Sequence, residues 1–146
     1  MKSLVTAAAL TASAACPVVA LCAPVALDNS LHCNVSAHTF VSELIAQGLL
    51  QAQPFRVESN SINAFNPVRG VSLHAFGYPV FAIVGYEEGD PLFQAGSGKR
   101  VSTSAYGAVV WGSTEKVQSA VTAAKSQAIV HHVAPFMTAI FCDREE

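Results

Sequence analysis

The sequence predicts an α+β domain: a mainly antiparallel sheet of four or five strands with two helices packed on one face. Two segments, residues 36–53 and 113–125, repeat apolar residues at helical spacing. Several shorter segments are apolar runs or alternate apolar with polar residues, as strands do. The chain of 146 residues is 51% hydrophobic and 12% charged, which suffices for one packed core. Helices set apart from runs of strands are typical of the α+β class.

The first helix is expected to begin after Ser36, because a serine hydroxyl can cap a helix N-terminus. Apolar residues within 40–49 then form one stripe along the helix. Pro54 disfavours helical backbone in the residue before it, so the helix should end by Gln53.

The middle of the chain predicts strands. Residues 55–65 are expected to form one strand that becomes polar at Ser59. Residues 71–76 alternate and residues 80–86 are nearly all apolar, which indicates two adjacent strands or one long bent strand. Residues 87–103, rich in glycine and charge, form the longest predicted loop.

The last third of the chain predicts a strand at 106–111 and a helix capped by Ser113. Strand segments at 129–133 and 136–142 follow, interrupted by Pro135. The strand–helix–strand unit is expected to make one right-handed parallel crossover, as in split βαβ or ferredoxin-like folds.

The N-terminus is typical of an export signal. Lys2 is followed by an uncharged, mostly apolar run that extends from Leu4 to Ala23. Residues 1–23 are therefore predicted to be a signal peptide, cut somewhere within 20–27, and residues 24–146 to be a single domain without a transmembrane segment. The expected location is the periplasm or the exterior of the cell.

Two cysteines, Cys33 and Cys142, remain after the predicted cleavage. In an oxidising compartment such a pair is most simply a disulfide that ties the N-terminal segment to the last strand. Two buried free thiols are the alternative.

Candidate contact residues occur in two places. The 87–103 loop offers charged groups and one aromatic ring, and the polar end of the 55–65 strand with the turn after it offers hydrogen-bonding groups. The candidate binding loop residues are Glu87, Glu88, Asp90, Phe93, Lys99 and Arg100; the candidate polar edge residues are Asn60, Asn63 and Arg69. The aromatic residues Tyr78, Tyr86, Phe93 and Trp111 are expected in the core.

The formal net charge of −2 gives no basic field for phosphates, which argues against nucleic-acid binding. The sequence has no complete serine-nucleophile motif or phosphate loop, and its paired carboxylates lie only in the loop. A metal site built on His74, His131 and His132, with Glu58 or Asp143, is a minor alternative to surface or core histidines. We therefore expect no catalytic residue, metal or cofactor.

Two blocks carry a resemblance. Ser104-Ala105-Tyr106-Gly107-Ala108-Val109-Val110-Trp111-Gly112, after Gly77-Tyr78-Pro79-Val80-Phe81-Ala82-Ile83-Val84-Gly85-Tyr86, resembles small uncharacterised exported proteins of Gram-negative bacteria, some of interest as antigens. The resemblance implies export. It implies no activity and no site residue, because that group has no established activity.

The sequence thus predicts a non-catalytic exported domain that binds a protein or small-ligand partner through the loop and the polar edge. The first alternative is an inhibitor or immunity-type protein that blocks an envelope enzyme with the 87–100 loop. A metal-binding protein or hydrolase is the second alternative.

Overall fold

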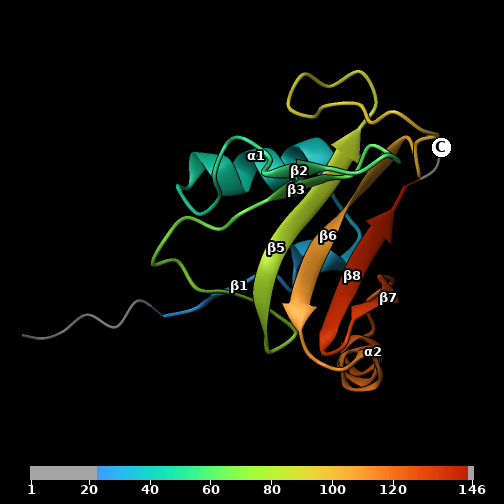
Figure 1. Ribbon diagram of the computed structural model, residues 1–146. Coiled ribbons are helices and arrows are strands. Elements are labelled where there is room, and N and C mark those ends of the chain that lie inside the picture. Colours follow the sequence, from blue (N-terminus) through green and yellow to red (C-terminus); the bar gives the residue numbers. More distant parts are fainter. Residues whose placement is uncertain (1–22, 145–146) are drawn as a thin grey trace, which may run out of the picture.

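The computed structural model describes residues 23–144, so the predicted signal peptide lies outside the described residues up to position 22 (Figure 1). Two α-helices and a mixed eight-stranded sheet make up the fold, which confirms the α+β class. The elements are β1 (Val25–Ala26), a 3-10 turn (Ser30–His32), α1 (Ala37–Ala46), β2 (Arg56–Val57), β3 (Asn63–Phe65), β4 (Leu73–Ala75), β5 (Tyr78–Glu87), β6 (Ser104–Trp111), α2 (Thr114–Ala123), β7 (Ile129–Ala134) and β8 (Met137–Asp143).

The strands lie in the order β1-β4-β5-β6-β8-β7. Strand β5 pairs with β4 through its first residues and with β3 through residues 83–85. The four long strands β5, β6, β8 and β7 are joined by antiparallel pairings, whereas β1 and β4 are parallel. The predicted count of four or five strands was wrong. Strands of two or three residues complete the sheet, and segments so short carry no periodic signal.

The β6–α2–β7 unit is a split crossover. Strand β8 is antiparallel to both β6 and β7, so β6 and β7 run parallel with β8 between them. The sequence predicted this parallel relation.

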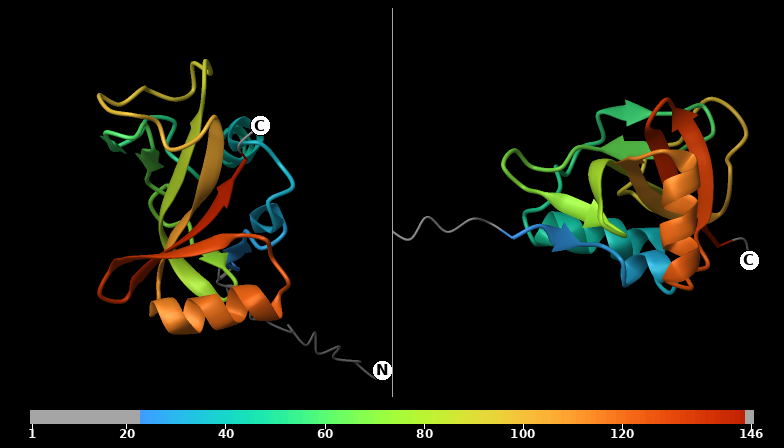
Figure 2. Two further views of the ribbon diagram at one scale, coloured as in Figure 1. Left: turned by 90° about the vertical axis from the view of Figure 1, so that its right-hand side faces the viewer. Right: turned by 90° about the horizontal axis from the view of Figure 1, so that it is seen from below.

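One face of the sheet, the inner face, is covered. The cross-strand row Gly85, Tyr106 and Cys142 lies on it. The ring of Phe40 in α1 lies 4.7 Å from that of Tyr106, and the Thr114 hydroxyl at the start of α2 lies 3.2 Å from the hydroxyl of Thr138 in β8. Figure 2 shows α2 beside β7 and β8, at the other end of the sheet from α1.

Helix α1 begins where predicted, since the Ser36 hydroxyl accepts a hydrogen bond from the Thr39 N–H at 3.1 Å. It ends at Ala46, well before Gln53. The reason is Gly48, which has a φ of 70° and donates to the Ile45 carbonyl in a glycine-type C-terminal cap. Helix α2 begins directly after Ser113, as predicted, but the Ser113 side chain makes no capping hydrogen bond.

The predicted Cys33–Cys142 disulfide is confirmed, with the two Cα atoms 5.2 Å apart. It ties the segment before α1 to the inner face of β8. Because the bridge closes a separation of 109 residues, the chain-entropy model assigns it roughly 4 kcal/mol of stabilisation.

Residues 55–65 do not form the single strand that the sequence predicted. They form a hairpin of β2 and β3, and the Glu58 N–H donates to the Ile62 carbonyl at 2.8 Å across its turn. Ser61 adopts a φ of 72° at this turn. The polar segment that suggested a weak strand is therefore a turn, where small polar side chains are favoured.

Candidate functional site

The connection between β5 and β6, residues 88–103, extends past the end of β5 (Figure 1). Its first half is fixed by Phe93, whose side chain is 7% exposed and whose ring lies 6.2 Å from that of Phe65 and 6.4 Å from that of Tyr86. Phe93 therefore belongs to the core and is not a contact residue of the loop. The single aromatic residue of the predicted loop is the residue that fixes the loop to the core.

Residues 94–101, which we call the anchored loop, are held by the β2–β3 hairpin. The Asn63 side chain is fully buried, and its amide donates to the Gln94 carbonyl at 2.8 Å and accepts from the Gln94 N–H at 2.9 Å. The Gly96 N–H donates to the Ser61 hydroxyl at 2.9 Å. These bonds satisfy buried polar groups that would otherwise cost free energy.

The hairpin backbone adds two further bonds. Gly98 donates to the Ser59 carbonyl at 2.8 Å, and Val101 donates to the Asn60 carbonyl at 3.1 Å. A Cβ atom on Gly96 would lie 2.2 Å from the Glu58 carbonyl oxygen, so the loop backbone approaches the hairpin at a distance that only glycine allows.

The polar residues of this segment make contacts that the sequence did not indicate. Asn63 holds the loop through its buried side chain, whereas Asn60 is half-buried and holds the loop through its backbone carbonyl. Arg69 is exposed and lies apart from them, between β3 and β4. The sequence showed the amide-rich segment but not the loop 31 residues later that it binds.

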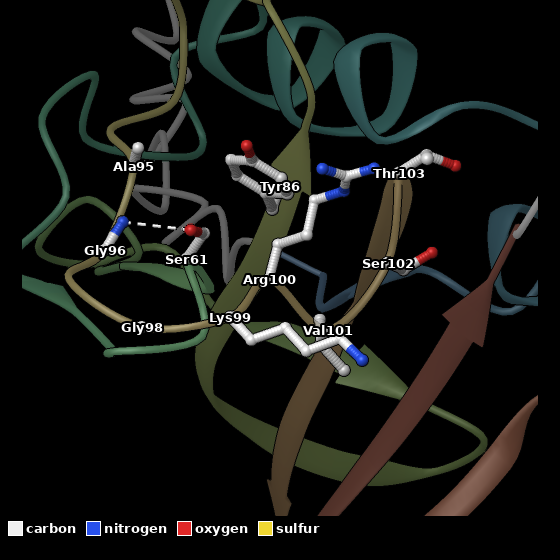
Figure 3. Close-up of a pocket in the computed structure, with 10 residues that line it drawn as sticks. All are labelled: Ser61, Tyr86, Ala95, Gly96, Gly98, Lys99, Arg100, Val101, Ser102 and Thr103. Atoms are coloured by element: carbon white, nitrogen blue, oxygen red, sulfur yellow. Dashed lines mark hydrogen bonds between the residues drawn. The ribbon is translucent and has the colours of Figure 1, made fainter.

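A cavity of about 550 Å³ lies between the anchored loop and β5 (Figure 3). Tyr86 and Ser61 line it from the sheet and the hairpin, and the loop lines the remainder. Figure 3 shows Lys99 and Arg100 extending from the loop in different directions. Ligand sites commonly have volumes of about 300–1,000 Å³.

The two cations at this cavity differ in their partners. Arg100 forms an ion pair with Glu88 at 2.9 Å, and both side chains are about half exposed. Such an exposed pair contributes little free energy. Among residues 23–144, no ion pair involves Lys99, so its ammonium is the positive charge that a ligand can meet without displacing a carboxylate.

Two of the predicted loop acids turn away from the cavity. Glu87 accepts a hydrogen bond from the His38 N–H at 2.7 Å, and Asp90 contacts the His38 ring nitrogen Nδ1 at 2.5 Å. Acidic groups at a helix N-terminus are favoured by the helix dipole. Glu87 and Asp90 thus position the start of α1, a contact that sequence spacing did not indicate.

The histidines of the proposed metal site are not brought together. His74 lies on β4, and His131 and His132 lie on β7, with β5, β6 and β8 between those strands. Within the described part of the chain, no cluster of three or more histidine, cysteine or acidic side chains is placed to hold a metal ion.

The aromatic residues expected in the core separate into two groups. Tyr86 and Phe93 are buried and Tyr78 is half-buried, but Trp111 is 48% exposed. The expectation for Trp111 was wrong because the end of β6 that carries Trp111 is covered on one face only.

No helix among residues 23–144 has the length and apolar character needed to cross a membrane. Comparison of the chain with protein-family models, curated proteins and solved structures gives no match. The resemblance to exported proteins therefore stays a prediction, and the functional argument rests on the anchored loop and its cavity.

Proposed function

We propose that this chain is an exported, non-catalytic binding domain whose ligand occupies the cavity beside the anchored loop. The observation that carries the proposal is the set of five hydrogen bonds that join residues 94–101 to the β2–β3 hairpin. They fix the loop before any ligand arrives, so that binding does not have to order it, which favours affinity.

The lining of the cavity favours a small polar ligand that carries negative charge. Three residues that carry hydroxyl groups, Ser61, Tyr86 and Thr103, line it together with Lys99. Ammonium groups attract carboxylates and phosphates as point charges, and hydroxyls can accept or donate to the same groups. The ligand class that fits is a small organic anion.

Export is part of the proposal. The signal-like N-terminus motivates it, and the Cys33–Cys142 disulfide supports it because disulfides persist in oxidising compartments. A periplasmic or secreted domain without a catalytic constellation would act by sequestering or presenting its ligand.

The first test titrates the exported protein with citrate and inorganic phosphate and follows the amide signals of residues 94–103 by NMR. We expect these amides to shift, and Lys99→Met to weaken binding about tenfold or more because the free cation is lost. Lys116→Met, which removes an exposed charge from α2, is the matched control and should bind as the parent does. Anions that leave the loop amides unshifted would contradict the ligand class.

The second test uses two glycines of the anchored loop. A Cβ atom at Gly96 would clash with a backbone oxygen at 2.2 Å, whereas one at Gly98 would lie 3.1 Å from the nearest backbone oxygen. Gly96→Ala should therefore displace the loop and abolish anion binding while the fold is retained, and Gly98→Ala should have the smaller effect. Equal binding by the parent and both variants would show that the loop conformation does not matter.

An inhibitor or immunity-type function is the second candidate, because the exposed anchored loop at the end of the sheet is also suited to entering the cleft of an enzyme. Shortening residues 95–100 discriminates the two. Loss of capture of an envelope enzyme by the folded, shortened chain, with no anion binding by the parent, would favour the inhibitor.

A further inference from the structure

The face of the sheet opposite the helices, the outer face, is defined by the strand register. Gly107 pairs with Phe141, and Phe141 pairs with Ile129. The next row joins Val109, Ala139 and His131 in the same way. Directly opposed residues point to the same side, so these rows lie opposite the row of Tyr106 and Cys142.

Two β-bulges add an apolar side chain each to this face. In β5, Val80 pairs with Val110 and Ala82 pairs with Val109, so that Phe81 is the extra residue. Alternation from Val80, which is on the inner face, places Phe81 on the outer face.

The second bulge lies in β7. His132 pairs with Thr138 on the inner face and Ala134 pairs with Met137, which leaves Val133 as the extra residue. By the same alternation Val133 points to the outer face. Both irregularities therefore increase the apolar area of one face, and bulges often re-aim side chains for function.

The result is an apolar patch that faces water. Phe81 is 42% exposed, Trp111 48%, Ile129 47% and Val133 51%. The rings of Phe81 and Trp111 lie 5.4 Å apart in an edge-to-face arrangement. The outer-face patch consists of Phe81, Val109, Trp111, Ile129, His131, Val133, Met137, Ala139 and Phe141.

The charge of the patch selects among possible occupants. The nine side chains include no Asp, Glu, Lys or Arg, and the whole segment 126–142 contains none. A charged partner surface would lose its hydration here without gaining a counter-charge. A second copy of the same uncharged surface brings no like charges together and loses no ion pair.

The size of the patch is that of a weak interface whose association depends on protein concentration. The four exposed apolar side chains, Phe81, Trp111, Ile129 and Val133, leave on the order of 350 Å² of apolar surface in contact with water. This figure takes the area of an aromatic side chain as about 150–250 Å². Solitary patches of about 300–600 Å² are often functional, and a standard interface buries about 800 Å² per partner. The half-exposed Val109, Met137 and Phe141, with their surrounding backbone, provide further area within the patch.

We propose that two copies of this chain associate face to face through the outer-face patch, in a two-fold dimer that completes a sandwich of two sheets. Self-complementary contact is what a closed two-fold dimer requires. The inner faces then lie outside the contact. Tyr86, which pairs with Ala105, points to the outer side, so the cavity and the anchored loop border the contact at the end of β6 opposite Trp111. This inference does not depend on the identity of the ligand or on the proposed function.

The molecule contains its own probe for this contact, since Trp111 is the single tryptophan of the chain and lies within the patch. We expect the purified exported protein to sediment as a dimer near about 100 µM and to dissociate on dilution toward about 0.1 µM. Trp111 emission should shift to longer wavelength over the same range as the ring becomes exposed. A monomer throughout, with constant emission, overturns the proposal.

Two matched variants place a charge inside and outside the patch. Phe81→Lys buries a lysine from each copy against an apolar surface and should weaken association about tenfold or more. Phe55→Lys is the control, because Phe55 is 47% exposed and precedes β2, at the edge of the sheet remote from β7. Sedimentation gives the mass, and far-UV circular dichroism verifies that both variants fold. A dimer that persists in Phe81→Lys, or that is lost equally in Phe55→Lys, contradicts this interface, as does a monomer that binds only a different protein.

Discussion

Two aromatic pairs lie on opposite faces of the same sheet. Phe40 and Tyr106 meet on the inner face at 4.7 Å, and Phe81 and Trp111 meet on the outer face at 5.4 Å. Tyr106 and Trp111 belong to one strand, β6. The inner rings are 2% and 0% exposed, whereas the outer rings are 42% and 48% exposed.

The difference shows that ring-to-ring contact alone does not bury an aromatic pair. The inner pair is covered because helix α1 carries one of its rings and the segment before α1 crosses the other. The Tyr106 hydroxyl donates to the Ser30 carbonyl at 2.7 Å and lies 3.5 Å from the Val35 N–H. The outer pair packs on the sheet, and no other element among the described residues covers its solvent-facing side. We therefore assign folding stability to the inner pair and association to the outer one.

The largest expected effect is that of Phe40→Ala. Removing a fully buried phenylalanine leaves a cavity and should lower the free energy of unfolding by about 3–5 kcal/mol. Phe81→Ala is the matched variant on the outer face, and its cost at low protein concentration should be within about 0.5 kcal/mol. Urea unfolding measures both, provided that the slope with denaturant is unchanged. Equal losses would mean that the two faces contribute alike to the fold.

The sequence predicted the elements that carry local signals. Ser36 and Ser113 identified the starts of both helices, and Pro135 marked the turn between the last two strands. The disulfide was predicted because two cysteines remain after the predicted cleavage and the expected compartment is oxidising. What could not be predicted was which apolar face is covered, because a strand with two apolar faces has the same pattern whether one layer or two lie against it.

The intermediate effect concerns the Tyr106 hydroxyl. Tyr106→Phe leaves the Ser30 carbonyl without its donor and should cost about 1–2 kcal/mol. Burial raises the pKa of Tyr106 above its ordinary value, against smaller lowering effects of the Val35 N–H and the Arg144 charge. In the unfolded chain tyrosine titrates near pH ~10, so above that pH the unfolded state releases its proton first.

The stabilisation linked to this proton is consequently complete below pH ~10 and is lost as the pH rises toward the folded pKa. Tyr106→Phe should remove the loss of stability at alkaline pH that is due to ionisation of Tyr106. The measurement compares the denaturant midpoints of the parent and the variant from neutral to alkaline pH. A parent and variant whose midpoints fall in parallel above pH ~10 would argue against a buried, protonated Tyr106.

The candidate site was predicted only in part. Lys99 and Arg100 were identified as loop cations, and the structure places both at the cavity. Asn63 was identified as a hydrogen-bonding group, and the structure shows its amide bonded to the backbone of Gln94. A buried amide and an exposed one have the same local sequence, and only the return of the chain from β5 shows which backbone the amide meets.

The smallest expected effect on folding is that of Trp111→Ala. Trp111 is the largest side chain of the outer pair, yet nearly half of its surface meets water, and the ring edge of Phe81 is its aromatic contact. At a concentration where the chain is monomeric, the substitution should change the free energy of unfolding by about 0.5 kcal/mol or less.

At high concentration the parent should gain apparent stability by mass action, because only folded chains can associate, and Trp111→Ala should not. The informative quantity is therefore the dependence of the midpoint on protein concentration. A loss above about 2 kcal/mol in the dilute variant would show that the outer pair supports the fold itself, and the distinction between the two faces would fail.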